Sequence, residues 1–198
     1  MSIRDLSSID GHTVLGISLS AKKSKKSSCT SILNYTLEQL NPIYKNVVHV
    51  SMAEFELPLF EGLMPGEIRD ETYQSVHDAV NNCGALVLGI PCYWSGISGV
   101  AKNFIDVLSG PLYDHPENFK SIFKGKPMGL ILVGADETSA QEGKEQMLKI
   151  TQAIEADLLP KIVVINNPRR AGKEQEELFQ ENLLMLNLML LKKMRSNG

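Results

Sequence analysis

The stretch PCYWSGISGVAKNFIDVL, residues 91–108, holds an aromatic pair, Tyr93 and Trp94, where an apolar run gives way to a segment of helical period. Trp94 is the only tryptophan of the chain. Turn-forming residues surround the pair: Pro91, Ser95, Gly96 and Gly99. Aromatic side chains usually lie in the core, so an aromatic pair in a turn favours a flat, apolar ligand against it. Two alternatives stay open, inward packing and a subunit contact.

A second candidate for ligand binding is the loop SLSAKKSKKSSCTS, residues 18–31. It combines hydroxyl side chains with lysines: Ser18, Ser20, Ser24, Ser27, Ser28, Thr30, Lys22, Lys23, Lys25 and Lys26. The N–H groups and dipole at a helix N-terminus attract phosphate, and hydroxyls add donors. Because neither GxxxxGK[ST] nor GxGxxG is present, the loop suits a single phosphate. The alternative is an ordinary helix cap, Ser27 or Ser28, after a solvated loop.

Two other patterns carry weaker signals. Lys102 and Asp106 are spaced i, i+4, which is typical of a surface ion pair worth about 0.3–0.5 kcal/mol, with a subunit or fold role as the alternative. The histidines show no metal-ligand spacing; they are His12, His49, His77 and His115. His115 lies in a polar insertion, PLYDHPENF, but a lone loop histidine without a visible partner favours no catalytic role.

Apolar runs of strand length alternate with longer segments of helical period. The expected strands are 12–18, 46–52, 85–90, 127–135 and 161–166. The expected helices are 28–40, 65–84, 98–108, 140–157 and 174–194, with Ser98 as a helix cap. Such alternation predicts a parallel sheet with helices on both faces, and no linker or repeat divides residues 1–198, so we expect a single domain. Five strands favour an α/β, flavodoxin-like three-layer sandwich with strand order 2-1-3-4-5.

This strand order brings the two candidate segments together. In open α/β sheets, ligands bind beyond the carboxyl ends of the strands, at the switch point between strands one and three. The loops expected to matter are therefore 18–28, 90–98 and 134–140.

The composition excludes several classes of protein. Apolar residues make up 43% and charged residues 22%, which indicates a soluble globular protein. A net charge of −3 gives no basic field for nucleic acid. The apolar run 183–191 is too short to cross a bilayer and MSIRDLSSIDG has no signal core, so we expect no membrane partner and a cytoplasmic location. The cysteines are unclustered and are expected to be reduced thiols without a metal: Cys29, Cys83 and Cys92.

The residues of 91–106 also resemble a known signature, that of the NADPH-dependent FMN reductase family, seen in related quinone and azo-dye reductases. The pattern P-x-Y-x-x-S-x-x-G-x-x-K-N-x-x-D is matched at Pro91, Tyr93, Gly99, Lys102, Asn103 and Asp106. Gly96 stands at the family's serine, with Ser95 one place earlier. ELPLF, residues 56–60, resembles the family's L-P-x-[FY] turn. In the first loop, Ser28 and Thr30 take the places of the serine and asparagine of G-S-x-R-x-x-S-x-N, whose arginine is missing here.

This resemblance implies an enzyme that passes hydride from NADPH or NADH through bound FMN to a quinone, free flavin or similar small electron acceptor. The phosphate would lie at 18–30, and the isoalloxazine ring against 91–96 and 134–136. The implied cofactor-binding residues are Ser18, Ser20, Ser28, Cys29, Thr30, Pro91, Cys92, Tyr93, Trp94, Ser95, Gly96, Gly134, Ala135 and Asp136. No catalytic side chain is implied, because the cofactor supplies the reactivity. In the third loop, Asp136 and Glu137 depart from the family's small uncharged residues and would repel an anionic reduced flavin.

Two other functional classes compete with this interpretation. A flavodoxin-type electron carrier would bind flavin without turnover of its own, but such carriers are typically strongly acidic, unlike this chain with its net charge of −3. A receiver-like or purely structural α/β domain is the other class. A receiver needs paired acids just after strand one, where this chain has Ser18, Leu19 and Ser20.

The closing helix predicts self-association. Eight of the nine residues in LLMLNLMLL, 183–191, are apolar. A helix that is apolar nearly all round needs cover on more than one side, so we expect a homodimer or homotetramer. The alternative is a helix covered fully by its own domain.

Overall fold

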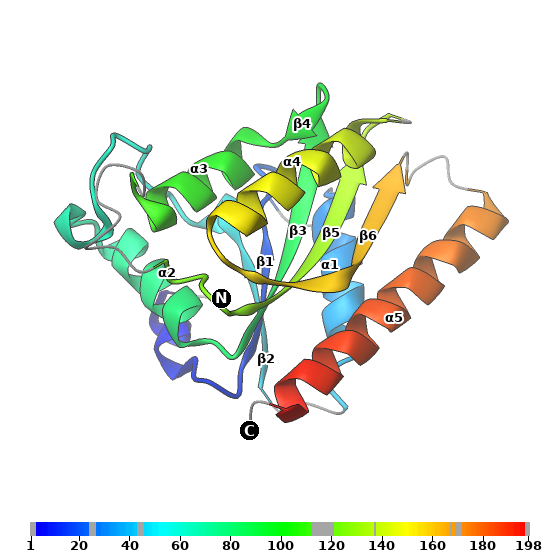
Figure 1. The fold of residues 1–198 in the computed structure, drawn as a ribbon, viewed down its shortest axis with the longest axis horizontal. Coiled ribbons are helices and arrows are strands. Elements are labelled where there is room, and N and C mark those ends of the chain that lie inside the picture. The colour runs from blue at the N-terminus through cyan, green and yellow to red at the C-terminus, as the bar shows by residue number, and fades with distance from the viewer. Residues whose placement is uncertain are drawn as a thin grey trace.

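A twisted parallel sheet with helices on both faces runs through the protein (Figure 1). The structure, a computed structural model, describes residues 3–23, 27–42, 46–111, 121–136, 138–166, 168 and 172–196. The strands are β1 (Val14–Ser18), β2 (Val47–Ser51), β3 (Ala85–Tyr93), β4 (Gly96–Ile97), β5 (Pro127–Gly134) and β6 (Asp157–Asn166). The α-helices are α1 (Ser28–Glu38), α2 (Glu71–Asn82), α3 (Gly99–Ser109), α4 (Ser139–Ala153) and α5 (Lys173–Ser196). Short 3-10 turns span Ile3–Ser8, Met52–Glu54 and Pro65–Glu67.

The sheet order β2-β1-β3-β5-β6 confirms the predicted order of the five long strands. One strand was not expected: β3 continues beyond the predicted end at residue 90, turns, and pairs antiparallel with the two-residue β4. A second difference is the predicted helix 65–84, of which only 71–82 is α-helical. Asp70 caps α2 by accepting a hydrogen bond from the Tyr73 amide at 2.7 Å, so the helix begins there.

Two apolar layers enclose the sheet. Helices α2, α3 and α4 cover one face, in front in Figure 1, and α1 and α5 cover the other. Successive residues of β3 alternate between the layers, with Leu86 and Leu88 in the first and Ala85 and Val87 in the second. The central strand is therefore buried on both faces, as its uninterrupted apolar sequence predicts.

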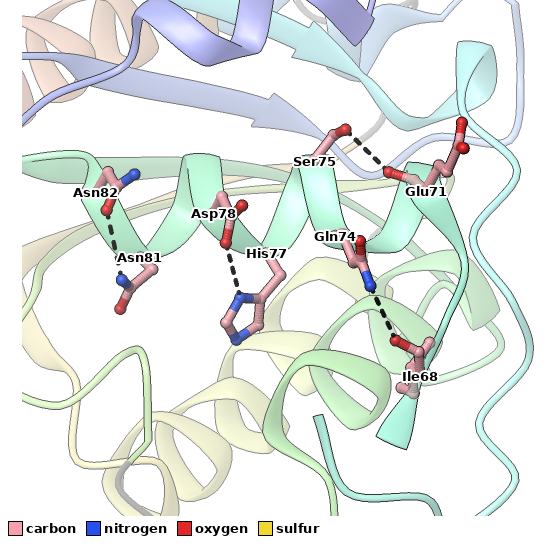
Figure 2. A network of polar contacts seen from close by, with 8 residues as sticks. All are labelled: Ile68, Glu71, Gln74, Ser75, His77, Asp78, Asn81 and Asn82. Carbon is pink, nitrogen blue, oxygen red and sulfur yellow. Dashed lines mark hydrogen bonds and ion pairs between the residues drawn. The ribbon is translucent and has the colours of Figure 1, made fainter. Parts of the chain in front are cut away.

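Helix α2 shows how the outer faces are solvated. Its polar side chains bond mainly within the helix, as between Ser75 and the Glu71 carbonyl oxygen and between His77 and Asp78 (Figure 2). Its buried side chains are Tyr73, Val76, Ala79 and Val80. His77 is partly exposed on this helix face and also packs against the Tyr73 ring, with ring centroids 5.6 Å apart.

Helix α5 is only partly covered by the rest of the chain. Leu183, Leu186 and Leu190 are buried against the sheet. The opposite side exposes Leu178, Leu184, Met185 and Leu188. The alternative of a helix fully covered by its own domain is thus not what the structure has. Within the described ranges, no helix combines the length and hydropathy that a membrane span requires.

A substitution at Gly84, between α2 and β3, tests how tightly the chain packs where β1 and β3 begin. Its amide donates to the Thr13 carbonyl oxygen at 3.0 Å, and an added Cβ would collide with the Gly11 carbonyl oxygen. We expect Gly84→Ala to lower the free energy of unfolding by about 1–3 kcal/mol, the usual cost of overpacking. Gly99→Ala is the matched control, since an added Cβ there meets nothing within 4 Å. Urea denaturation of both variants measures the difference, and equal stabilities would show that the backbone at Gly84 yields freely.

The three cysteines test the burial of the core by their reactivity. All are free thiols in buried positions. Burial raises the pKa of Cys83 to about 11 and that of Cys92 to about 12, and it raises the pKa of Cys29 as well. Only the thiolate is nucleophilic, so at pH 8 we expect iodoacetamide to react with these thiols at least about 100-fold more slowly than with free cysteine, whose pKa is about 8.5. Mass spectrometry should find complete alkylation only in denaturant. Fast alkylation of any thiol in the folded protein contradicts this assignment.

Candidate functional site

Three loops meet at the carboxyl ends of β1, β3 and β5, where the predicted site lies. The Leu19 amide donates to the Gly89 carbonyl oxygen at 2.8 Å, and the Ser98 hydroxyl donates to the Leu19 carbonyl oxygen at 3.0 Å. Cys92 and Gly134 are partners in the pairing of β3 with β5. Ser98 also caps α3, as predicted, by accepting from the Ala101 amide at 3.2 Å. The hydroxyl of Ser98 therefore joins the first loop to the start of the signature helix.

The first loop closes on itself through two serines. Ser27 is the cap of α1 and accepts a hydrogen bond from the Thr30 amide at 3.3 Å. Its hydroxyl donates to the Ser20 hydroxyl at 3.0 Å, and Ser20 also accepts from the Lys22 amide at 3.2 Å. Ser20 is buried, so it shapes the loop from inside. Ser28 is the first residue of α1 and is half-buried, which leaves it at the surface of the helix N-terminus.

Two predicted phosphate ligands lie beneath that surface. The hydroxyls of Ser18 and Thr30 are 2.7 Å apart, and both residues are buried. Cys29 is also buried, close to Gly89, where an added Cβ would lie 3.2 Å from the Cys29 sulfur. These three side chains fasten the helix start to the sheet. Among the described residues of this loop, the donors left to face a ligand include the hydroxyl of Ser28 and the amides of Ser28 and Cys29, because the Thr30 amide is already bonded to Ser27.

The aromatic turn is the tip of the β3–β4 hairpin. Trp94 and Ser95 form a two-residue connection in which both φ angles are positive, 51° and 65°. Trp94 is 97% exposed, so it does not pack inward. Tyr93 is 39% exposed. Partial burial, with the thiols of Cys29 and Cys92 as smaller causes, raises the pKa of Tyr93. Tyr93 is the last residue of β3, and Gly89 of the same strand lies against Cys29 and Leu33 of α1, so the hairpin and the first loop border the same edge of the sheet.

Helix α4 supports the hairpin from below. Cys92 packs against Gly143, where an added Cβ would lie 2.5 Å from the Cys92 sulfur. The side-chain oxygen of Gln146 accepts a hydrogen bond from the Ile97 amide at 3.0 Å and lies beside Gly96. Gln146 could not be singled out from the sequence, because its partner is 49 residues away.

The third loop is built around Asp136. Its carboxylate accepts from the Ser139 hydroxyl at 2.5 Å and from the amides of Thr138 and Ser139 at 3.0 and 2.7 Å. These hydrogen bonds lower the pKa of Asp136, and the bond from the Ser139 hydroxyl has the largest effect. The charge lies at the N-terminus of α4, whose dipole stabilises it. Ala135 beside it is exposed.

Gly134 lets this loop approach α4 closely. An added Cβ there would lie 2.7 Å from the side-chain oxygen of Asn166, which accepts from the Ala140 amide at 3.3 Å.

Several residues considered from the sequence lie outside the described part of the chain: Ser24, Lys25, Lys26, His115 and Glu137.

The signature helix α3 anchors a fourth loop. Asn103 accepts from the Phe60 amide and donates to the Pro58 carbonyl oxygen, both at 2.9 Å. The asparagine of the signature thus holds the ELPLF turn, a link that the sequence pattern alone did not reveal. Lys102 and Asp106 form the predicted ion pair at 2.6 Å on the surface, at a groove of about 350 Å³ between α3 and α4.

The chemistry available at this edge is that of binding. A helix N-terminus with hydroxyl and lysine side chains can hold an anion, and two partly or fully exposed aromatic side chains can contact a flat ring. Among the residues that the structure describes, no cluster of three or more histidine, cysteine, aspartate or glutamate side chains could hold a metal ion.

Comparisons with known proteins identify the fold and the family. Solved structures with the same fold include an NADH:FMN oxidoreductase (EMOB, apo form; TM-score 0.68, 13% identity, 89% of this chain and 88% of that chain covered). Another is the flavoenzyme NAD(P)H:(acceptor) oxidoreductase FerB from Paracoccus denitrificans (TM-score 0.67, 15% identity, 94% and 98% covered). At these identities, the likeness concerns the fold alone.

Sequence comparison is more specific. The chain is 30% identical over 94 residues to YwqN of Bacillus subtilis (strain 168), named for NAD(P)H-dependent, FMN-containing oxidoreductase activity. The match covers 44% of this chain and about half, 51%, of that protein's length. The model of the family described as NADPH-dependent FMN reductase matches residues 13–169. The chain therefore belongs to the NADPH-dependent FMN reductase family.

Proposed function

We propose that this protein is an FMN-dependent NAD(P)H oxidoreductase that passes hydride from NADPH or NADH to a quinone, free flavin or similar small acceptor. Family membership supports the flavin. The observation that carries the proposal is the position of the α1 N-terminus, which opens at the switch point of the sheet beside the Tyr93–Trp94 turn. A phosphate site and a site for a flat ring are thus adjacent, which is what FMN requires.

The residues at the α1 N-terminus fit a monophosphate. Ser28 presents a hydroxyl in the first turn, and the exposed Lys22 and Lys23 lie a few residues before it. Ser27 is occupied as the cap, and its bond to Ser20 holds the loop that places these groups. A second phosphate would need a further set of donors such as the Gly-rich dinucleotide loop, which is absent from the sequence. FMN is therefore favoured over FAD.

The protein's own part in the reaction is binding, orientation and electrostatics, since bound FMN would supply the hydride chemistry. Tyr93 and Trp94 would line the ring from the hairpin. The backbone of residues 134–136 would face it from the next strand. Because Asp136 already accepts three hydrogen bonds at the start of α4, its charge is partly offset before any flavin binds. This tempers the repulsion of a reduced, anionic flavin.

The phosphate site is tested by Ser28→Glu. A carboxylate there would compete for the same amides and would repel the phosphate, by roughly 4 kcal/mol for unit charges 4 Å apart at an effective dielectric constant of 20. We expect FMN affinity, measured by calorimetry, to fall at least about 100-fold. Gln74→Glu adds the same charge to an exposed position of α2 and should leave the affinity unchanged. Equal affinities of the Ser28 variant and the parent would place the phosphate elsewhere.

We also infer a homodimer or homotetramer, because α5 exposes Leu184 and Leu188 on the side away from its own domain. A second copy of the chain would cover them. We expect Leu184→Glu with Leu188→Glu to reduce the mass measured by sedimentation velocity, since charges in an apolar interface are costly. Leu63→Glu, at an exposed loop position, should not. A parent protein that sediments as a monomer would contradict the inference.

A further inference from the structure

The tip of the β3–β4 hairpin has a backbone conformation that its sequence disfavours. Trp94 and Ser95 both have positive φ angles, 51° and 65°. Turns of this kind are normally built from Asn-Gly or similar pairs, and a bulky aromatic residue at positive φ is rare. Such strain persists only where the surrounding structure holds it.

The backbone pairing within the hairpin contributes little to keeping the turn in this strained conformation. β4 is two residues long and pairs with β3 at Cys92–Ile97 and Tyr93–Gly96, with one more backbone bond at the base, from the Ser98 amide to the Pro91 carbonyl oxygen at 2.8 Å. Trp94 is 97% exposed, so packing of its indole contributes almost nothing. Figure 1 shows β4 at the top of the molecule, above α4. The support must therefore come through the backbone of β4.

Gln146 of α4 supplies a contact of this kind. Its side-chain oxygen accepts the hydrogen bond from the Ile97 amide at 3.0 Å. The same oxygen sits so close to Gly96 that an added Cβ there would lie 3.2 Å from it. One carboxamide thus contacts both residues of β4, immediately after the strained turn.

We propose that Gln146 is a positioning residue that holds the Trp94 turn, so that the indole, at the edge of the proposed flavin site, also forms one wall of the space for a flat, conjugated acceptor ring. This rests on the proposed function. The backbone sets where the indole leaves the chain, since the ring makes almost no packing contact, and the backbone just after the turn is bonded to α4 through Ile97. A planar quinone can stack on that wall, whereas a compact inorganic oxidant such as ferricyanide cannot.

Gln146→Met removes the acceptor oxygen at similar length, and Gln146→Glu keeps an oxygen acceptor. Gln141→Met, at an exposed position of the same helix, is the control. The first readout is the fluorescence anisotropy of Trp94 without FMN, which has a single source because the chain has one tryptophan. We expect lower anisotropy in Gln146→Met only, with thermal melting confirming that each variant is folded. Unchanged anisotropy would overturn the role of Gln146.

The second readout is the KM for a benzoquinone beside that for ferricyanide, in the FMN-loaded enzyme. We expect Gln146→Met to raise the quinone KM at least about five-fold more than the ferricyanide KM, with Gln146→Glu close to the parent. Equal changes for both acceptors, or a change in sedimentation instead, would overturn Trp94 as a substrate wall. If the parent does not bind FMN, the proposed function and that wall fail together, while the anisotropy comparison still decides whether Gln146 holds the turn.

Discussion

The parallel pairing of β1 with β3 is the constraint on which the site depends. Ser18 is the partner of Gly89 in this pairing, and β1 ends there while β3 continues to Tyr93. Because β2 lies on the other side of β1, the chain leaves the sheet in opposite directions at this point and opens a crevice. The buried contact between the hydroxyls of Ser18 and Thr30 then fixes where α1 begins, and so where its N-terminal amides point.

Side chains near this crevice divide into those that build it and those that face it. The building set is buried and mutually bonded, as with Ser20 and Ser27 in the first loop. The facing set is half-buried or exposed, as with Ser28, Tyr93 and Trp94. Buried polar groups need partners inside the protein, so they are poor ligand donors but precise supports. The hairpin follows the same division, since its exposed tip is followed by a part-buried hydrogen bond from the Ile97 amide to Gln146.

The elements and their order could be predicted from the sequence because alternation of apolar runs is a local signal. The predicted strand order holds, and so does the cap of α3 at Ser98. The number of hydroxyl residues in 18–31 does not show which of them hold the loop together and which face a ligand. That distinction depends on which hydroxyls bond to each other in the folded chain. Neither β4 nor the bond from Ile97 to Gln146 has a local signature, because each depends on residues brought together by the fold.

The central claim is that the N-terminus of α1 holds the phosphate of FMN. Comparing the affinities of FMN and riboflavin for the same preparation by calorimetry tests it most directly, because the two ligands differ only in that phosphate. Two charge-assisted hydrogen bonds contribute about 1.5–3 kcal/mol each, so FMN should bind at least about 100-fold more tightly than riboflavin. The advantage of FMN should shrink as salt rises, because exposed charges are screened. Equal affinities for the two ligands would contradict the account.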